Sequence, residues 1–528
     1  MNERIASILK NLVFALALTW ITMQLFGYFF GSKSDIKQGE IKPGQQAQAL
    51  MAEELFKPLN LDVTFADQKV PAEEDTEIGT DYCNMLFSSH GAVLQSIDFK
   101  EHLNKNGKPL RTIFDRGSMD EGQRKKGCFL LAFEDKTPYF YKLIATNRGV
   151  EKTDLIYQAQ HDGWTITKTF GIYKKSYQLD VTLAFESDKK HSDIKPRLFF
   201  GAPYISELGD DAISLVTYNE TKNSIERRDI ATDQGSAWYW KTDKPIFGAE
   251  DKYFLHCMIN DGSKFAQRAY FKMYDSSMVT PILEGPTVAA KQSFTLSFYI
   301  GPKVFDHLIA VDERLEEVMS FGWLSWFCKL LLKLLQWLYD LIGNYGLAII
   351  AMSFILKLPF APFSIYARKK TEEYQKFQPS INRIREKYKH DQALQHQEFL
   401  KFHRDHNISP TTPAMGCLPL IVQIPILFSL YRVLGNYLDL YQAPFFGWLT
   451  DLSAKDPFYV LPILLGLFSV WQQSLMPVSD DKQRLMSMFM AVVMTVVFAS
   501  FPAGLVLYWL MNTLFTIAED YARKLIYR

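Results

Sequence analysis

The apolar segment "IIAMSFILKLPFAPF", which begins at Ile349, contains one ionisable side chain, Lys357. The next charge is Arg368, and about ten helical residues cover roughly 15 Å, half the hydrocarbon core of a bilayer. Inserting a lysine at that depth costs about 2.5–3.5 kcal/mol. We therefore expect Lys357 to be sheltered there or to serve a function.

A counter-ion for Lys357 is not evident, because the five apolar regions after residue 341 contain no Asp or Glu at mid-depth. The nearest carboxylates, Asp340, Asp439, Glu519 and Asp520, lie at the ends of those regions. An unpaired ammonium requires water or a thinned bilayer. We therefore expect Lys357 to lie in a wet groove. The polar side chains that could line it with Lys357 are Ser353, Gln423, Ser429, Gln472, Gln473, Asn512 and Thr516, and the apolar segment of a substrate would pass Tyr508, Trp509 and Met511. For the polar side chains, hydrogen bonding between helices is the alternative.

The composition of the 528 residues excludes several classes of protein. The chain is 22% charged with a formal net charge of zero, which argues against a general nucleic-acid binder. The five cysteines are scattered, without a CxxC pair or ligand-like spacing to histidine. We find no nucleotide, hydrolase or metalloprotease motif. The sequence therefore predicts no cofactor, no metal, no small-molecule substrate and no covalent catalysis.

The first part of the chain predicts a membrane anchor followed by a β domain. Residues 11–32 carry no charge and follow Arg4 and Lys10, which indicates a retained anchor in 1–32 with a cytoplasmic N-terminus. A cleaved signal peptide is the alternative. Residues 33–78 are polar and are interpreted as a flexible tether. Runs such as "WTITKTFGIY" alternate apolar and polar residues, which predicts a β-sandwich in 79–318 outside the cytoplasm.

The second part predicts helices that lie in or cross the membrane. Lys329, Lys333, Gln336 and Asp340 form a polar stripe along 321–340, which favours an amphipathic interfacial helix over a spanning one. Pro502 and Gly504 break a long uncharged region into two short spans. The predicted spans after the anchor are 342–366, 414–436, 457–476, 485–501 and 503–520, followed by a cytoplasmic tail, 521–528. The fold class is therefore a polytopic helical membrane protein with six spans and an inserted all-β domain.

Charge asymmetry places residues 367–413 in the cytoplasm, since they hold ten Lys and Arg, whereas the loop 438–456 holds only Lys455. Apolar residues recur at helical spacing on both sides of "KHD", which predicts a helical hairpin. This segment is either a solvated loop without a specific binding role or a docking surface for an acidic partner such as ribosomal RNA. The candidate docking residues are Arg368, Lys369, Lys370, Arg383, Arg385, Lys387 and Lys389.

Four stretches resemble the YidC/Oxa/Alb family of membrane protein insertases, in its Gram-negative form with a large periplasmic domain. They are "FYIGPK", "GCLPLIVQIPI", "YQAPFFGWLTDLSAKDPFYVLPILLG" and "FPAGLVLYWLMNTL". The resemblance implies an inner-membrane insertase whose five core spans enclose a hydrophilic groove that is open to cytoplasm and lipid but closed outside. It places the groove cation, usually arginine, at Lys357, with Ser353 one turn earlier, and an aromatic pair at Tyr508 and Trp509. "NISPTTPAMGC" is longer than the family pattern, so the entrance to that span is expected to differ.

The implied partners are nascent membrane proteins, membrane lipids, Sec translocon components, and a ribosome or targeting factor at the hairpin. One alternative is a secondary transporter or anion-binding channel that uses Lys357. The chain lacks the internal repeats and midplane carboxylates expected of that class. A second alternative is an assembly factor that acts through its β domain. Deleting most of 79–300 distinguishes an insertase from such an assembly factor, because insertion then survives only if the chain is an insertase.

Overall fold

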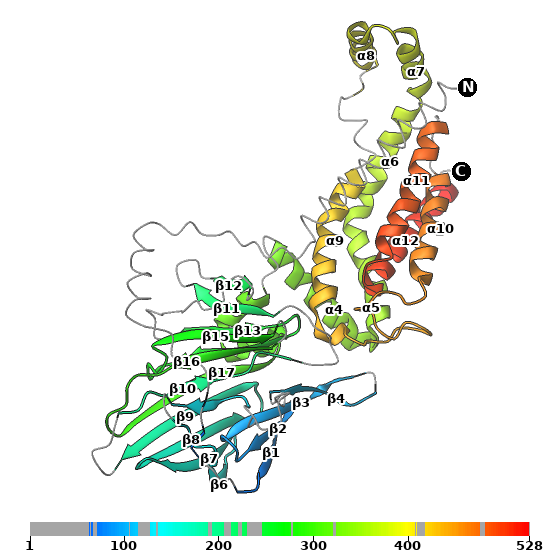
Figure 1. Cartoon of the computed structure of the whole chain (residues 1–528). Coiled ribbons are helices and arrows are strands. Elements are labelled where there is room, and N and C mark those ends of the chain that lie inside the picture. The colour runs from blue at the N-terminus through cyan, green and yellow to red at the C-terminus, as the bar shows by residue number, and fades with distance from the viewer. Residues whose placement is uncertain are drawn as a thin grey trace. The chain divides into compact units, whose positions relative to one another are not determined.

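The computed structural model describes most of the chain from residue 71 onward (Figure 1). The described residues are 63, 65, 66, 71–104, 106–114, 127–133, 136–187, 193–204, 213–219, 224–229, 245–275, 278–319, 324–406, 408, 418–475 and 481–526. They fall into two compact units, one within Lys33–Ser320 and one within Phe321–Arg528, called here the β unit and the helical unit. The predicted anchor 1–32 lies outside the described residues, as does most of the predicted tether.

The β unit is built from antiparallel strands, as predicted. The runs that indicated strands in the sequence are β8 (Trp164–Tyr173), β9 (Gln178–Ser187) and β17 (Gln292–Pro302). Buried and partly exposed residues alternate along β9, as expected of a strand with one face in a core. The other strands are β1 (Asp75–Gly79), β2 (Cys83–Ser88), β3 (Val93–Leu103), β4 (Pro109–Ile113), β5 (Leu130–Ala132), β6 (Lys142–Arg148), β7 (Lys152–His161), β10 (Arg197–Phe199), β11 (Ser214–Asn219), β12 (Ser224–Asp229), β13 (Phe247–Glu250), β14 (Phe254–Asn260), β15 (Arg268–Asp275) and β16 (Met278–Glu284).

Three sheets make up the sandwich. The largest has nine strands in the order β12-β11-β13-β14-β17-β9-β8-β7-β6, and the two four-stranded sheets are β1-β2-β3-β4 and β15-β16-β10-β5. Aromatic rings join the layers: β2 contacts β8 through Phe87 and Phe170, whose centroids are 4.9 Å apart. The core between the sheets is therefore apolar, as the alternation of the strands predicted.

The β unit begins earlier than the sequence suggested. The predicted tether extended to residue 78, but β1 starts at Asp75 and pairs with β2 from Asp75↔Ser88 to Gly79↔Asn84. Along β1 only Ile78 is buried, so this edge strand has almost no hydrophobic signal. Backbone hydrogen bonding, which side-chain patterns do not report, places it in the sheet.

One charged side chain lies inside the sandwich. Lys168 of β8 is fully buried, and its Nζ donates to the carbonyl oxygens of Gly91 (2.8 Å), Ala92 (2.9 Å) and Phe129 (2.8 Å). Three acceptors match the three N–H groups of an ammonium, but burial lowers the pKa of Lys168 to about 7. The side chain ties the turn after β2 to the centre of the large sheet.

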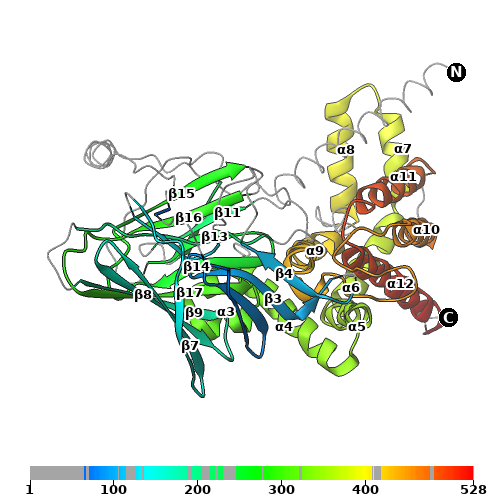
Figure 2. The ribbon, with the colours of Figure 1, turned by 60° about the horizontal axis from the view of Figure 1, so that its bottom comes forward.

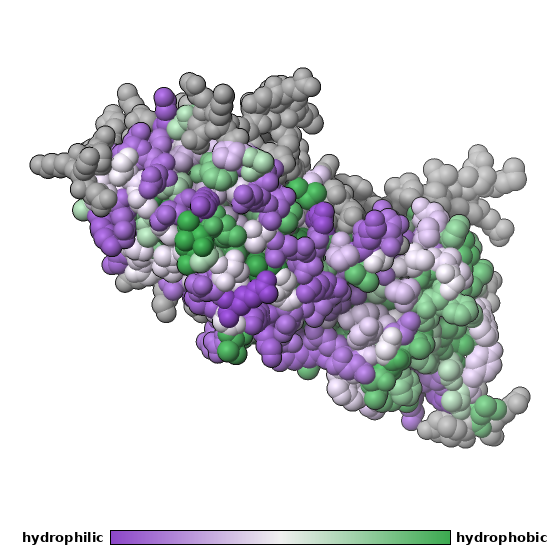
Figure 3. Space-filling view, turned by 90° about the horizontal axis from the view of Figure 1, so that it is seen from below, coloured by the Kyte–Doolittle hydropathy of each residue, from purple (hydrophilic) through white to green (hydrophobic). Residues whose placement is uncertain are grey.

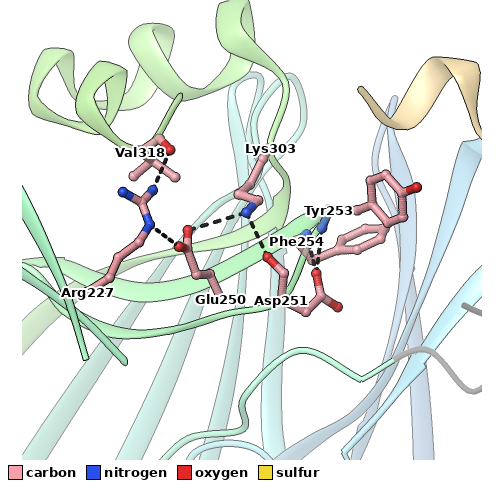
Figure 4. Close-up of polar contacts among 7 residues, drawn as sticks. All are labelled: Arg227, Glu250, Asp251, Tyr253, Phe254, Lys303 and Val318. Atoms are coloured by element: carbon pink, nitrogen blue, oxygen red, sulfur yellow. Dashed lines mark hydrogen bonds and ion pairs between the residues drawn. The ribbon is translucent and has the colours of Figure 1, made fainter. Parts of the chain in front are cut away.

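A second cluster of charged side chains, around Glu250, holds the segment that follows the last strand of the β unit (Figure 4). The carboxylate of Glu250 on β13 lies between Arg227 of β12 and Lys303, with 3.4 Å between Lys303 Nζ and Glu250 Oε2. Arg227 also donates to the Val318 carbonyl at 2.5 Å, in the 3-10 helix η3 (Glu313–Met319), which follows α3 (Phe305–Val311). Burial raises the pKa of Glu250, but the two cations outweigh it and hold the pKa below its ordinary 4.5.

The helical unit contains the predicted helices with shifted ends. Its elements are α4 (Ser325–Ile342), α5 (Tyr345–Lys357), η5 (Leu358–Phe360), α6 (Ala361–Gln375), α7 (Gln378–Lys387), α8 (Gln392–Asp405), α9 (Leu418–Asn436), η7 (Leu438–Leu440), α10 (Val460–Leu475), α11 (Asp481–Phe498) and α12 (Ala503–Ile526). The predicted break at Pro502 is confirmed, since α11 ends before it and α12 starts after it. Figures 1 and 2 show α12 beside α5 and α10.

The helix of the predicted span 342–366 continues beyond the span, because Tyr345–Gln375 forms one helical stretch of 31 residues. It alone among the described helices is both long and apolar enough to cross a membrane by length and composition, and Val460–Leu475 and Leu485–Phe498 are shorter apolar helices. Six spans therefore remain a prediction.

Two further helical predictions are confirmed. Helices α7 and α8 form a hairpin beyond α6, with Phe377 and Phe402 packed at 6.1 Å between ring centroids (Figures 1 and 2). Helix α4 is amphipathic: Cys328, Leu331 and Leu335 are buried in the helical core, whereas Trp326 and Trp337 are exposed. In Figure 3 hydrophobic residues spread over the helical unit, while hydrophilic residues dominate the β unit. Large exposed apolar areas are expected where lipid is the solvent.

Candidate functional site

Lys357 lies at the last position of α5, where the chain passes through η5 into α6. Its Nζ donates to Thr516 Oγ1 at 2.6 Å and lies 3.5 Å from Glu519 Oε2, both on α12. The side chains of Lys357 and Glu519 are 16% and 19% exposed. The prediction that Lys357 lacks a counter-ion was therefore wrong. Helix α12 continues to Ile526, so that Glu519, which we had placed at a span end, lies beside the ammonium.

One face of α12 presents polar groups at helical spacing. Tyr508, Asn512, Thr516 and Glu519 recur at i, i+4, i+8 and i+11. The Thr516 hydroxyl accepts from Lys357 and donates to the Asn512 carbonyl at 2.7 Å, so both of its roles are used. The lysine is thus bound to a continuous polar face of its neighbour.

Gln423 and Tyr508 form a second polar contact, in which Gln423 Nε2 on α9 donates to the Tyr508 hydroxyl at 2.6 Å. Tyr508 is only 2% exposed. This is the interhelical bonding that we weighed as the alternative to a wet lining. Between α9 and α12 the structure therefore brings Gln423 and Tyr508 together, whereas Lys357 contacts Thr516 and Glu519.

Three of the other predicted groove residues have different contacts. Ser353 is 1% exposed, and its hydroxyl donates to the Ile350 carbonyl of its own helix at 2.7 Å. Trp509 packs on Phe498 of α11, with ring centroids 5.0 Å apart, and Met511 packs partly buried against the helical core. Thr516, one of the polar side chains predicted to line the groove, does contact Lys357, and Glu519 is the residue that the prediction missed. The i+7 spacing from Asn512 was the signal that could have found it.

Further ion pairs join α6 to the end of α12. Arg368 pairs with Asp520, whose side chain is 7% exposed, and Arg523 Nη2 lies 2.9 Å from Glu372 Oε1. Helix α6 leads directly into the α7–α8 hairpin, so these pairs hold the base of the hairpin against α12. Arg368, one of the predicted docking residues, forms one of these ion pairs with α12.

Five of the seven predicted docking residues are exposed on α6, α7 and the turn after α7: Lys369, Arg383, Arg385, Lys387 and Lys389. Lys370 forms an exposed pair with Glu373, at 2.9 Å between Nζ and Oε2. Exposed pairs of this kind contribute little stability. Five cations in this short stretch form a positively charged surface.

The loop between α9 and α10 covers the other end of α12. The first amides of α12, at Ala503 and Gly504, donate to the carbonyls of Ala454 (2.7 Å) and Leu452 (2.9 Å) in that loop. Asp456 in the same loop is 2% exposed, and it accepts from the Leu461 amide at 2.7 Å at the start of α10. The loop therefore satisfies helix ends that would otherwise be unpaired and closes this end of the bundle.

Within the part of the chain that the structure describes, no group of three His, Cys, Asp or Glu side chains could hold a metal ion. Cys83, Cys128, Cys257 and Cys328 are buried free thiols. Burial raises the pKa of Cys83 to about 11, which keeps it protonated and unreactive.

A β-sandwich unit joined to apolar helices that hold a sheltered cation defines a helical membrane protein with a large folded β domain. Residues 75–334 match the family model of the YidC periplasmic domain, and residues 337–527 match the model of the 60Kd inner membrane protein. The chain belongs to the YidC family of membrane protein insertases.

Two relatives illustrate the match. The chain is 30% identical over 538 residues to the membrane protein insertase YidC of Geotalea daltonii, covering 97% of this chain and 98% of that one. It is 35% identical over 498 residues to the YidC of Geobacter metallireducens, covering 91% and 90%. A crystal structure of active YidC insertase with its first transmembrane domain resolved is 19% identical, covers 90% of this chain and 97% of its own, and has a TM-score of 0.39.

Proposed function

We propose that this chain inserts apolar segments of nascent proteins into the inner membrane through a hydrophilic groove at Lys357. Family membership supports the activity, and the observation that supports the site is the ammonium bonded to the polar face of α12. The proposed topology has six spans, both termini in the cytoplasm and the β unit in the periplasm. Insertion proceeds alone or with Sec translocon components.

In this mechanism Lys357 attracts an acidic or polar part of the arriving polypeptide from the cytoplasm. The apolar part of the substrate then moves along α12 past Tyr508, Trp509 and Met511 into lipid. Burial of the substrate in hydrocarbon drives the step, and the membrane potential adds about 2.3 kcal/mol per charge per 100 mV. No covalent bond forms or breaks.

The hairpin α7–α8 supplies the docking surface in this proposal. Arg383, Arg385 and Lys387 are exposed on α7 and carry the charge that ribosomal RNA or an acidic targeting factor would bind. The ion pairs of Arg368 and Arg523 fix the base of this hairpin next to the groove. A docked ribosome would therefore release its nascent chain close to Lys357.

Purified protein in liposomes tests the activity. A single-span substrate is synthesised in its presence, and protease protection of its short translocated tail is compared with that in empty liposomes. The proposal predicts protection that depends on the protein. A photo-crosslinker at Met511 is expected to capture the substrate, whereas one at Val496, an exposed position on α11, provides the matched control. Protection no higher than in empty liposomes, with the protein shown to be folded, would contradict the proposal.

A further inference from the structure

Lys357 is not an open positive charge. Its Nζ is bonded to the Thr516 hydroxyl and lies 3.5 Å from the Glu519 carboxylate. The carboxylate of Glu519 therefore occupies the position that a substrate carboxylate would need in order to pair with Lys357. The substrate can bind the ammonium only when Glu519 moves away from it.

Glu519 is held in that position by its neighbours on α12. The next residue, Asp520, is 7% exposed and pairs with Arg368 on α6. One turn further along, Arg523 lies 2.9 Å from Glu372 of α6 and 3.7 Å from Asp520. These pairs fix this turn of α12 against α6, so the Glu519 carboxylate is placed beside Lys357 by the fold.

The pair also changes the charge that a substrate meets. A lone ammonium attracts every acidic segment, whereas a close ammonium–carboxylate pair has no net charge, so that its field falls off quickly with distance. The two side chains keep 16% and 19% of their surface exposed, so an arriving carboxylate can still reach the pair and exchange with Glu519. An exchangeable pair suits a site that must bind substrate briefly and release it.

We infer that Glu519 is a specificity-determining residue, a built-in competitor for Lys357 that restrains insertion of acidic segments and leaves neutral ones unaffected. This inference rests on the proposed insertase function. A substrate with one aspartate in its translocated tail displaces Glu519 from Lys357. A substrate with asparagine at the same position passes without doing so.

The test compares two substrates that differ only in that residue, Asp or Asn, in the full-length protein in liposomes. Glu519→Gln keeps the size of the side chain and removes the competing charge. The ratio of Asp-tail to Asn-tail insertion is expected to rise about two- to fivefold, as expected for a partly exposed pair. Glu519→Asp keeps a carboxylate and is expected to give a ratio close to that of the wild type.

Glu373→Gln provides the matched control, because it removes a carboxylate from α6 whose exposed pair with Lys370 holds neither α12 nor Lys357. It is expected to leave the ratio unchanged. The double variant Lys357→Gln with Glu519→Gln is expected to lose the gain in Asp-tail insertion, since the ammonium that Glu519 faces at 3.5 Å is also removed. If Glu519 had only a structural role, Glu519→Gln would lower the insertion of both substrates equally. That effect would be the same with and without Lys357.

An unchanged ratio in Glu519→Gln, with Asn-tail insertion still dependent on the protein, would overturn the inference and leave the insertase function intact. An equal loss for both substrates would also overturn it. Failure of the wild type to insert the Asn-tail substrate above empty liposomes would contradict the proposed function itself, and with it the inference.

Discussion

Gln423 of α9 and Tyr508 of α12 share a hydrogen bond of 2.6 Å between the amide Nε2 and the phenol oxygen, in the core of the helical unit. The bond joins α9, the helix that follows the α7–α8 hairpin in the sequence, to the helix that carries the partners of Lys357. Tyr508 is almost completely buried and Gln423 is half-buried, so the bond lies largely away from solvent.

Replacing Tyr508 by Phe is expected to lower the free energy of unfolding by about 1–3 kcal/mol, because it leaves the Gln423 amide without its acceptor. Thermal unfolding in detergent measures the loss. Tyr521→Phe, at an exposed position on the same helix, is the control and should have almost no effect. The double change Gln423→Leu with Tyr508→Phe should recover part of the loss, and a further loss would show that the bond is not the cause.

The buried ammonium of Lys168 predicts a pH dependence of the β unit. Burial lowers its pKa from 10.5 to about 7, so between these values the folded protein holds fewer protons than the unfolded chain. The free energy of unfolding therefore rises with pH across that window, by at most about 1.4 kcal/mol per pH unit, and this contribution is flat below pH 7. Hydrogen exchange in β8 of the full-length protein measures it.

Lys168→Met is expected to remove that slope, and to destabilise the β unit because three buried carbonyls lose their donor. Lys142→Met, at an exposed position on β6, is the control and should keep the wild-type slope. A slope that persists in Lys168→Met would assign the pH dependence to another group.

Glu250 predicts the opposite pH dependence at low pH. Its pKa is held below 4.5 by Arg227 and Lys303, so its contribution to stability is present above that value and is lost as the pH falls below it. Glu250→Gln should cost about 3 kcal/mol at pH 7, because it leaves the partly buried cations Arg227 and Lys303 without their carboxylate, and should flatten the acid limb of the unfolding curve.

Glu186→Gln is the matched control for Glu250. Glu186 pairs with Lys291 at 2.6 Å on the surface, where both side chains are more than half exposed, so its loss should cost less than about 1 kcal/mol. Equal costs for the two variants in thermal unfolding would contradict the role given to the Glu250 cluster.

The exposed cations of α7 predict the salt dependence of ribosome binding. Replacing Arg383, Arg385 and Lys387 by Gln should weaken binding and reduce the slope of log affinity against log salt by about 0.7 for each lost phosphate contact. Sedimentation with ribosomes at several salt concentrations measures both. The same number of Lys→Gln changes on the β unit should leave the slope unchanged, and a similar drop there would show that total charge, not the hairpin, is responsible.

Local patterns predicted the β unit and the hairpin well, since β8, β9 and β17 alternate apolar and polar residues and the "KHD" break separates α7 from α8. These patterns failed where contacts with another helix or strand determine the structure. β1 contains one buried side chain, so only its pairing with β2 identifies it as a strand.

Local sequence patterns were limited in the same way at the site around Lys357. Lys357 could be singled out because a charge in an apolar run is costly, but its partners are contributed by α12. Glu519 was assigned to a span end because charge marks the boundary of a span in sequence. The structure shows that Glu519 lies within α12, which continues to Ile526, and beside the end of α5, where Lys357 is. Ser353 had the right spacing but bonds within its own helix.

The most direct test of the central claim is the insertion of a single-span substrate with an acidic translocated tail by wild-type protein, Lys357→Arg and Lys357→Ala in liposomes. Protease protection of the tail is the readout, with unfolding in detergent to show that each variant is folded. Our account predicts protection by wild type and Lys357→Arg, and a loss in Lys357→Ala, because only a cation attracts the tail. Equal protection with Lys357→Ala would contradict the role of Lys357 as the cation of the groove.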